Sequence, residues 1–405
     1  MYTRNKEFYD IVGRGLAAMG YTGNKPLEAW INDMFADKYN AEQTFAQMGF
    51  PLNPNIPLNP TYEQIEATIR PYTLATYVDI DSDGATKSTD GLSLQMGGLP
   101  TFKHEITLSR KILREKMMLM DAIGSSTPEI EATIMELLFN GVDSLLGGNY
   151  NTFLYQRNQV VSQKGTLIIN AANNPLGISL SIDFGVPKKN IKDSHWYKKV
   201  DATGAVTQET AVGTTIDPIK VMRDVNRDSR QKDFAPQGHW EVSKTTWDDI
   251  ISLPYFRQMY TVANRPDISD KGMQLAFANL VPDEVIKAFI EARIGAEIRV
   301  IDSISVVESY DKDTQKINYK TLQNFEEGVM AYVPNEDLGD VQCGRPIFME
   351  TPGARTALYD GGRTLIRQIF NDETMTQTIK SEVTGLVVPN KVRWFYYLNV
   401  KGKQP

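Results

Sequence analysis

One long helical pattern constrains what this chain can fold into more than any other feature. Between residues 127 and 164, apolar residues recur at steps of three and four, which places them on one face of a helix. Pro128 suits the first helical turn, which has no use for the missing N–H, and Gly165 can take the left-handed conformation that ends a helix. The residues of the apolar face are Ile130, Ile134, Leu138, Val142 and Leu145.

The length of this segment has two consequences. At ~1.5 Å per residue an unbroken helix would reach roughly 55 Å, so it needs a flanking sheet or a neighbouring subunit to lie against. Gly147-Gly148 is its weak point, because a glycine costs ~1 kcal/mol inside a helix. The pattern predicts one long helix, with a kink or a break at this pair as the alternative.

The composition permits a large core and excludes several kinds of site. The chain has 405 residues, of which 41% are hydrophobic and 23% charged, enough for two or three domains. Its net charge of −7 gives no sign of a protein that holds nucleic acid through a basic face. The one cysteine, Cys343, can form neither a disulfide within the chain nor a cysteine metal cluster.

No targeting segment is expected. The first twenty residues carry five charges and no apolar h-region, so they do not read as a signal peptide. No uncharged apolar run approaches the ~18 residues that span a bilayer. We expect a protein that folds in the cytosol and does not enter a membrane.

The region before the long helix reads as short helices, a strap and an arm. Helices are expected over 8–19, 26–39, 41–48 and 111–120, and one or two helical turns within 61–71. Prolines at every third position from Pro51 to Pro60 favour an extended, unpaired strap. Strands over 72–78 and 92–96, around a turn at 81–84, predict a two-stranded arm over 72–105. An isolated hairpin is marginal in water, so the arm needs another surface.

The region after the long helix alternates strands and helices. A strand is expected over 178–184, and the block 217–307 reads as a compact α/β unit. Its helices are predicted over 218–229, 245–260 (with a Thr245…Asp248 cap) and 282–294, and its strands over 240–243, 297–301 and 304–307. Strands over 328–333, 342–349 and 392–400 follow, the last buried on both faces.

The sequence offers no catalytic, cofactor-binding or metal residue. His104, His195 and His239 lie far apart in the chain, and none is expected to have a ligand-forming neighbour. Cys343 is expected to be a buried, hydrophobe-like residue rather than a nucleophile. The common nucleotide-binding, hydrolase and zinc-protease motifs are missing. The adjacent carboxylates at 248–249 and 326–327 should point apart.

One segment, 79–90, partly matches a calcium-binding loop. The flanking residues read as strands rather than helices, and Thr86 stands where an aliphatic residue is expected. A solvated hairpin tip whose aspartates favour turns is the preferred interpretation, and whether the loop binds a cation is left open. The residues that match are Asp79, Asp81, Asp83, Gly84 and Asp90.

Several short segments resemble one protein family because they occur in its order and at its spacing. They are 99–105 with 109–114, 158–165, 182–186, 329–335 and 386–390. From about residue 60 to the end, the chain resembles tailed-phage major capsid proteins of the lambda-type "major capsid protein E" kind, whose shell fold is shared with encapsulins. Residues 355–385 look like an insertion relative to this family.

The resemblance implies an α+β fold, the tailed-phage capsid shell fold, with five parts. They are an N-terminal arm (1–60), an extended β-hairpin loop (61–110), a peripheral domain (111–215) with the spine helix (127–164), an axial α/β domain (216–340) and C-terminal strands (341–405).

The same resemblance implies a structural major capsid protein of a bacteriophage and no enzyme. It would self-assemble into hexamers and pentamers of an icosahedral shell that encloses packaged double-stranded DNA. Expected partners are many copies of itself, a separate scaffolding protein, a portal and the nearby DNA, and whether a decoration protein also binds is left open. No cofactor is expected, and the location is the virion capsid after assembly in the host cytoplasm. The alternatives are an encapsulin-type compartment shell and a soluble α/β enzyme with an unrecognised site.

Overall fold

The computed structural model contains both helices and strands, which confirms the α+β fold class. It describes residues 15–23, 25–35, 38–39, 41–68, 91–108, 118, 127–175, 177–200, 205–311, 316–346, 354–371 and 376–402. The strand expected over 72–78, the turn at 81–84 and the loop at 79–90 lie outside these residues. So do most of the helix expected over 111–120 and the first part of the one over 8–19.

The chain divides into two compact units. The first unit comprises Met1–Glu63, Met96–Leu154 and Asp340–Val388. The second unit comprises Gln64–Gln95, Tyr155–Gly339 and Pro389–Pro405.

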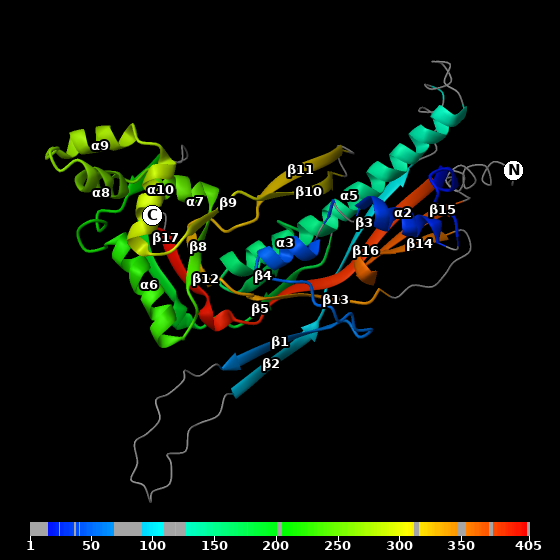
Figure 1. Cartoon of the computed structure of the whole chain (residues 1–405), viewed down its shortest axis with the longest axis horizontal. Coiled ribbons are helices and arrows are strands. Elements are labelled where there is room, and N and C mark those ends of the chain that lie inside the picture. Colours follow the sequence, from blue (N-terminus) through cyan, green and yellow to red (C-terminus); the bar gives the residue numbers. More distant parts are fainter. Residues whose placement is uncertain are drawn as a thin grey trace, which may run out of the picture. The chain divides into compact units, whose positions relative to one another are not determined.

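The predicted long helix is confirmed as α5 (Thr127–Ser162), whose 36 residues form one continuous element (Figure 1). The helix does not break at its glycine pair. Each glycine leaves room for a neighbouring ring: a Cβ at Gly147 would lie 3.0 Å from the Tyr39 hydroxyl, and one at Gly148 would lie 3.2 Å from His104 Cε1. The two rings therefore pack against the helix at positions where a larger side chain would crowd them. After the helix, Gly165 has the expected positive φ, 73°.

A five-stranded sheet forms the centre of the first unit. The order β13 (Gly339–Gly344), β16 (Thr376–Pro389), β15 (Thr364–Asn371), β14 (Ala354–Tyr359) is extended by β3 (Thr101–Leu108), which also pairs with β16. Pairs β14–β15, β15–β16 and β16–β3 are antiparallel. Residues 355–385, which look like an insertion in the sequence, supply most of β14, β15 and β16.

Short N-terminal helices and α5 contribute to the core of the first unit. α2 (Pro26–Phe35) lies on β14, where Asn32 Nδ2 donates to the Leu358 carbonyl at 2.9 Å. α2 is shorter than the predicted 26–39 helix, and α3 (Ala41–Gln47) confirms the next one. The main cluster of buried side chains comprises Leu16, Leu27, Trp30, Ile31, Phe35, Val142, Leu145, Leu146, Ala357, Tyr359, Ile366 and Ile379.

The proline strap is not unpaired as expected. The N–H of Val341 donates to the Pro51 carbonyl at 3.0 Å, and the N–H of Asn53 donates to the Val341 carbonyl at 2.9 Å. Farther along, the N–H of Arg345 donates to the Pro57 carbonyl at 2.9 Å. Proline lacks a donor but keeps its acceptor, so the strap can bond to the strand region 341–345 through its carbonyls.

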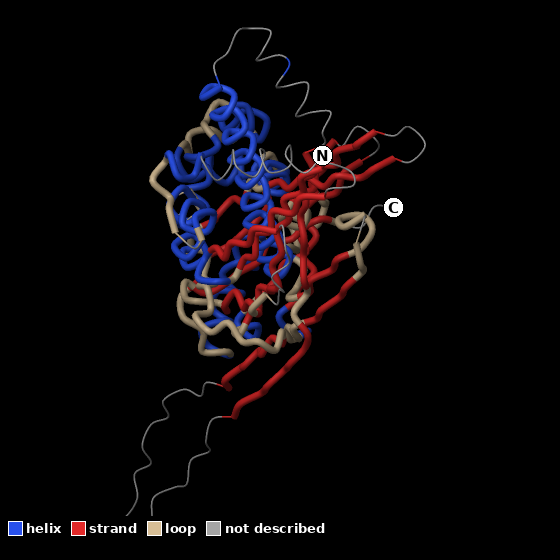
Figure 2. The backbone as a smooth tube through the Cα atoms, turned by 90° about the vertical axis from the view of Figure 1, so that its right-hand side faces the viewer, coloured by secondary structure: helices blue, strands red, loops and turns tan. Residues whose placement is uncertain are grey.

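The helical turns predicted within 61–71 are wrong, because β1 (Thr61–Thr68) is a strand that pairs with β2 (Gly91–Gly98) (Figure 2). Burial alternates along it: Tyr62 and Gln64 are buried, whereas Glu63 and Ile65 are exposed. This period of two is that of a strand with one covered face. The predicted extent of the arm is also wrong, since β3 joins the sheet of the first unit instead.

The second unit is built on a six-stranded mixed sheet. Its order is β7 (Ala205–Gln208), β6 (Ile191–Val200), β17 (Tyr396–Lys401), β12 (Val329–Pro334), β8 (Gly238–Ser243) and β9 (Ile298–Ile301). β17 pairs with β6 in parallel, as β8 does with β9, and the other neighbours are antiparallel. The predicted block 217–307 thus supplies only two strands of the sheet, and the last strand is buried as predicted.

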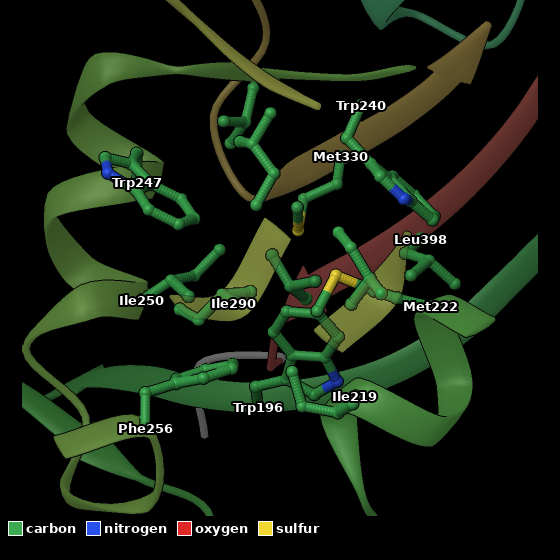
Figure 3. Close-up of a cluster of buried hydrophobic side chains, with 14 of the residues drawn as sticks. Trp196, Ile219, Met222, Trp240, Trp247, Ile250, Phe256, Ile290, Met330 and Leu398 are labelled. Atoms are coloured by element: carbon green, nitrogen blue, oxygen red, sulfur yellow. The ribbon is translucent and has the colours of Figure 1, made fainter. Parts of the chain in front are cut away.

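Helices of the second unit pack their apolar faces on this sheet (Figure 3). Trp196 and Trp240 of the sheet meet Met222, Ile250 and Ile290 of three helices in that core. The helices are α6 (Pro218–Lys232), α7 (Lys244–Ile251), α8 (Pro254–Asn264), α9 (Lys271–Asn279) and α10 (Asp283–Ile294).

Two predictions for these helices are wrong. The helix expected over 245–260 is divided into α7 and α8, and Pro254 begins the second, since proline fits a first turn but not a helix interior. Ser243 caps α7, where its Oγ accepts from the Thr246 N–H at 3.2 Å, in place of the expected Thr245. α9 was not predicted.

Two antiparallel pairs of strands complete the second unit. They are β4 (Thr166–Ile169) with β5 (Leu180–Asp183), and β10 (Ile304–Asp311) with β11 (Lys316–Gln323). The predicted strands over 178–184 and 304–307 correspond to β5 and β10.

We expect Gly165→Ala to destabilise the protein more than Gly295→Ala. Both glycines have a left-handed φ, of 73° and 71°, so each alanine incurs roughly 1–2 kcal/mol of backbone strain. Only at Gly165 would the new Cβ also meet Val186 Cγ2, at 2.4 Å. Urea unfolding measures the difference, and Gly165→Ala with Val186→Ala should recover the steric part. Equal losses for the two single variants would contradict this account.

Candidate functional site

A buried ion pair joins the last turns of α5 to strand β8 in the second unit. Arg157 and Glu241 are 4% and 1% exposed. Arg157 Nη1 donates to Glu241 Oε2 at 2.5 Å, and Arg157 Nη2 donates to Glu241 Oε1 at 2.5 Å. Two parallel bonds of this kind are the strong, geometrically specific form of a charge-assisted hydrogen bond. The pair therefore fixes the rotation of this end of α5 against the strand.

His239 extends this pair into a cluster. Its Nε2 lies 3.1 Å from Glu241 Oε1 and 3.1 Å from Arg299 Nη1, and its Nδ1 lies 2.5 Å from Asn335 Oδ1. The expectation that no histidine has a carboxylate neighbour is wrong here. His239 and Glu241 are two apart on one strand and so share a face, a spacing that the sequence contains.

The charges around Glu241 keep its carboxylate ionised. Burial alone would raise the pKa of Glu241, but the Arg157 charge and the hydrogen bonds from His239 and Arg157 outweigh burial and lower the pKa below its usual range. A catalytic acid needs the opposite shift, towards neutrality. The cluster is suited to holding α5 and β8 together rather than to proton transfer.

The other two histidines have surroundings of their own. His195 Nδ1 lies 3.0 Å from the Lys401 carbonyl oxygen, and the ring of His104 lies beside Gly148 of α5.

The remaining candidate groups behave as the sequence predicts. Burial raises the pKa of Cys343 to about 12, so its thiol stays neutral and acts as a small apolar group. The adjacent carboxylates have separate partners: Asp248 pairs with Lys244, whereas Asp249 lies 3.2 Å from Lys199. Likewise Glu326 accepts from Gln163 at 3.3 Å, and Glu327 lies 3.9 Å from Lys401.

The described residues contain no group of three or more histidine, cysteine or acidic residues that could hold a metal ion. The calcium-like loop at 79–90 lies outside them. A cavity of about 40 Å³ in the first unit, lined by Tyr39, Tyr150 and Arg363 among others, has room for a water molecule but not for a metabolite. Within the described residues, no helix is both long and apolar enough to cross a bilayer.

One face of β1 is covered, whereas residues 94 to 96 of β2 are all exposed. On the covered face of β1, Gln64 Nε2 donates to the Phe184 carbonyl at 3.1 Å, and Nε2 of the exposed Gln95 donates to the Asp183 carbonyl at 3.2 Å. The exposed large apolar side chains of this pair are Ile65, Leu94 and Met96, which are 50%, 60% and 54% accessible. We call these three residues the arm patch.

The β10–β11 hairpin exposes a second apolar surface. Ile304, Val306 and Tyr319 are 57%, 57% and 68% accessible. Val306 pairs with Thr321 and Tyr319 with Glu308. In β10 the exposed residues 304 and 306 alternate with partly buried ones, whereas both neighbours of Tyr319 in β11 are exposed as well. Two-stranded sheets gain little stability alone, and this one leaves apolar area uncovered by the described residues.

Comparisons with known proteins give distant structural likenesses. No protein-family model and no curated protein matches the sequence. Among solved structures, the chain is similar to the capsid of cyanophage A-1(L) (11% identity, 89% of this chain and 93% of that one, TM-score 0.44). It is also similar to a phage-related protein from Bordetella bronchiseptica RB50 (10%, 91% and 96%, 0.43) and to the capsid of Ralstonia phage GP4 (9%, 89% and 89%, 0.41).

We expect Glu241→Gln to lower the free energy of unfolding by about 3 to 5 kcal/mol, because it leaves the Arg157 charge buried without its counter-ion. The matched control is Asp248→Asn, which breaks the exposed pair with Lys244 and should cost at most about 1 kcal/mol. Urea unfolding at neutral pH measures both. Similar losses of unfolding free energy for the two variants would show that the buried pair stabilises the fold no more than the exposed pair does.

The stabilising effect of the Glu241 carboxylate should depend on pH. Because the folded-state pKa of Glu241 lies below its usual value of 4.5, the ionised carboxylate stabilises the fold above that pH. The stability difference between the natural chain and Glu241→Gln should therefore be full at pH 7 and shrink as the pH falls from about 5 to about 3. A difference that does not change with pH in unfolding titrations would contradict the assignment.

Proposed function

We propose that this chain is the structural major capsid protein of a tailed phage, which assembles as hexamers and pentamers into an icosahedral shell around double-stranded DNA. The single observation that carries the proposal is the arm patch on the two-stranded β1–β2 pair. One face of β1 rests on residues of its own chain, and the arm patch presents apolar side chains to water. Such a surface suits a permanent partner better than it suits an isolated monomer.

Copies of the same chain are the partner that best suits this surface. Closed symmetry lets every copy offer the same patch to a neighbour, so one sequence feature is used throughout the assembly. The β10–β11 hairpin, with Ile304, Val306 and Tyr319, adds a second surface of the same kind. Obligate assemblies typically bury 2,000 Å² or more in total, which several such surfaces together can reach.

The absence of an obvious reaction centre among the described residues is consistent with a structural role. Glu241 is held ionised and Cys343 neutral, the opposite of what an acid catalyst and a nucleophile need. We accordingly assign no enzymatic activity and no cofactor to the chain.

The sequence resemblance supplies the division into parts, which we retain as a proposal. α5 would be the spine helix of a peripheral domain, and α6 to α10 would belong to the axial domain around the hexamer and pentamer centres. The proposed parts are the N-terminal arm (1–60), the extended loop (61–110), the peripheral domain (111–215), the axial domain (216–340) and the C-terminal strands (341–405).

Other partners follow from the same proposal. A shell of this kind would form in the host cytoplasm on a separate scaffolding protein and would incorporate a portal. Its final location is the virion capsid.

We expect Ile65→Asp with Leu94→Asp to abolish shell formation while leaving the monomer folded, because a charge on the arm patch opposes burial against a neighbour. The control is Ile65→Val with Leu94→Met, which keeps the patch apolar. Sedimentation velocity and electron microscopy, with and without a co-expressed scaffold, measure assembly, and circular dichroism measures folding.

Two results would count against the phage shell. If the natural chain stays a small species under all these conditions, the chain is not a shell subunit. If closed shells form without any scaffold around an enzyme cargo, the chain is an encapsulin-type compartment protein.

A further inference from the structure

One face of α6 carries only basic and polar side chains. Lys220, Arg223, Arg227 and Arg230 recur at steps of three, four and three residues, and all four are exposed. The opposite face is apolar and buried, and Figure 3 shows Ile219 and Met222 in the core. A helix with 3.6 residues per turn separates these two sets onto opposite sides. We call the four exposed cations the basic stripe.

The charge of this helix is opposite to that of the chain. Within Pro218–Lys232 there are five basic residues, the stripe and Lys232, and two acidic ones, Asp224 and Asp228, which leaves a charge of +3. The whole chain carries −7. A local excess of positive charge on an acidic protein is therefore concentrated on one exposed helix face.

The two acidic residues of α6 already have basic partners. Asp224 Oδ1 lies 2.8 Å from Arg227 Nη2, and Asp228 lies 3.0 Å from both Lys232 and Lys192. Burial alone would raise the pKa of Asp228, but hydrogen bonds and charge from these two lysines lower it. The basic excess remains after both acidic residues are counted.

A neighbouring segment is held against α6 by two ion pairs. Lys192 of β6 reaches Asp228, and Lys189 Nζ lies 2.6 Å from Asp233 Oδ1 at the end of α6. Lys188, next in the chain, is exposed. These two ion pairs hold the segment 188–192 against α6, and they balance the charges of Lys189 and Lys192.

We propose that the basic stripe of α6 binds the phosphate backbone of double-stranded nucleic acid without reading its sequence. From Lys220 to Arg230 the helix rises about 15 Å, in steps of about 4.5 to 6 Å. One strand of B-DNA has a phosphate every 3.4 Å of axis, so the stripe is matched to a run of about four or five phosphates. Arginine and lysine against phosphate position a duplex but carry no sequence information.

A protein partner fits this surface less well. Protein interfaces have an apolar centre from which charged residues are depleted. None of the exposed large apolar residues among those described falls within α6, and the nearest along the chain, Phe234, lies beyond the end of the helix. An acidic surface on a second copy of the chain is the rival occupant, and the experiment separates the two.

The inference concerns the DNA that the proposed shell would enclose, but it does not depend on assembly. The assay therefore uses the full, unassembled chain and a short fluorescent duplex of arbitrary sequence, whose anisotropy is followed from about 50 to about 200 mM salt. We expect salt-sensitive binding of similar strength for unrelated sequences.

The test variant combines Lys220→Gln, Arg227→Gln and Arg230→Gln. It should weaken binding about tenfold or more and reduce the slope of log affinity against log salt by about 3, since each phosphate contact contributes about 0.9. Arg223 is left unchanged because its Nε donates to the Arg293 carbonyl at 2.7 Å and helps to hold α6 on α10.

Two controls isolate the stripe from general charge. Lys244→Gln, Arg265→Gln and Lys271→Gln remove the same charge from exposed positions on α7, α9 and the end of α8, and should leave binding unchanged. Arg227→Lys with Arg230→Lys keeps the charge and should keep binding, because a phosphate accepts either cation. Circular dichroism checks that each variant is folded.

Three outcomes would overturn the proposal. They are no salt-sensitive binding by the natural chain, equal losses for the two triple variants, and preferential binding of poly-glutamate, which would point to an acidic protein partner. If the test variant does not fold, Lys220→Gln and Arg230→Gln alone decide the matter, each with an expected slope change of about 1. Because shell assembly is measured without added DNA, failure here leaves the proposed function standing.

Discussion

The need to cover a 36-residue helix along its length governs much of this molecule. Such a helix is stable because tertiary packing buries its apolar face rather than because of local propensity. In the first unit Val142 and Leu145 are buried with residues of α2, β14, β15 and β16. In the second unit the same helix ends in a different environment, where Arg157 is held by Glu241 of β8. Each unit thus depends on its own part of α5, through apolar contact in one and a buried ion pair in the other.

The distribution of polarity is the physical basis of the proposed shell function. A charge pair lies inside the second unit, whereas Leu94 and Val306 are exposed on two-stranded pairs. Desolvating an ion pair is costly unless its geometry is good, and exposed apolar area is costly unless a partner covers it. The desolvation of the ion pair is offset within the chain by its two parallel hydrogen bonds, whereas the exposed apolar area needs a neighbouring molecule to cover it. The basic stripe adds a third exposed surface, whose chemistry fits a polyanion and not an apolar partner.

The elements that could be predicted are those whose signals are local. α5 has a regular apolar period and a glycine at its end, and β17 has a dense run of aromatic residues, so both were found from the sequence. β1 was mistaken for helix because Glu63, Gln64 and Glu66 suit either structure, and its partner β2 lies on the far side of residues 69–90. For the same reason the strands within 355–385 were not assigned. Their pairing with β3 joins residues such as Ile379 and Ile106 that are distant in the chain.

The charged sites likewise differ in how far the sequence alone reveals them. The stripe from Lys220 to Arg230 and the pair His239 and Glu241 are both visible as spacings, and the overall acidity of the chain concealed the first. The local pattern was enough to specify where α5 runs and that Cys343 would be a small buried apolar residue, because periodicity and side-chain size act within a few residues. Only the folded chain decided that Arg157 meets Glu241, 84 residues away, and that β1 pairs with β2. Such contacts depend on which surfaces meet once the chain has collapsed, and no short stretch of residues contains that information.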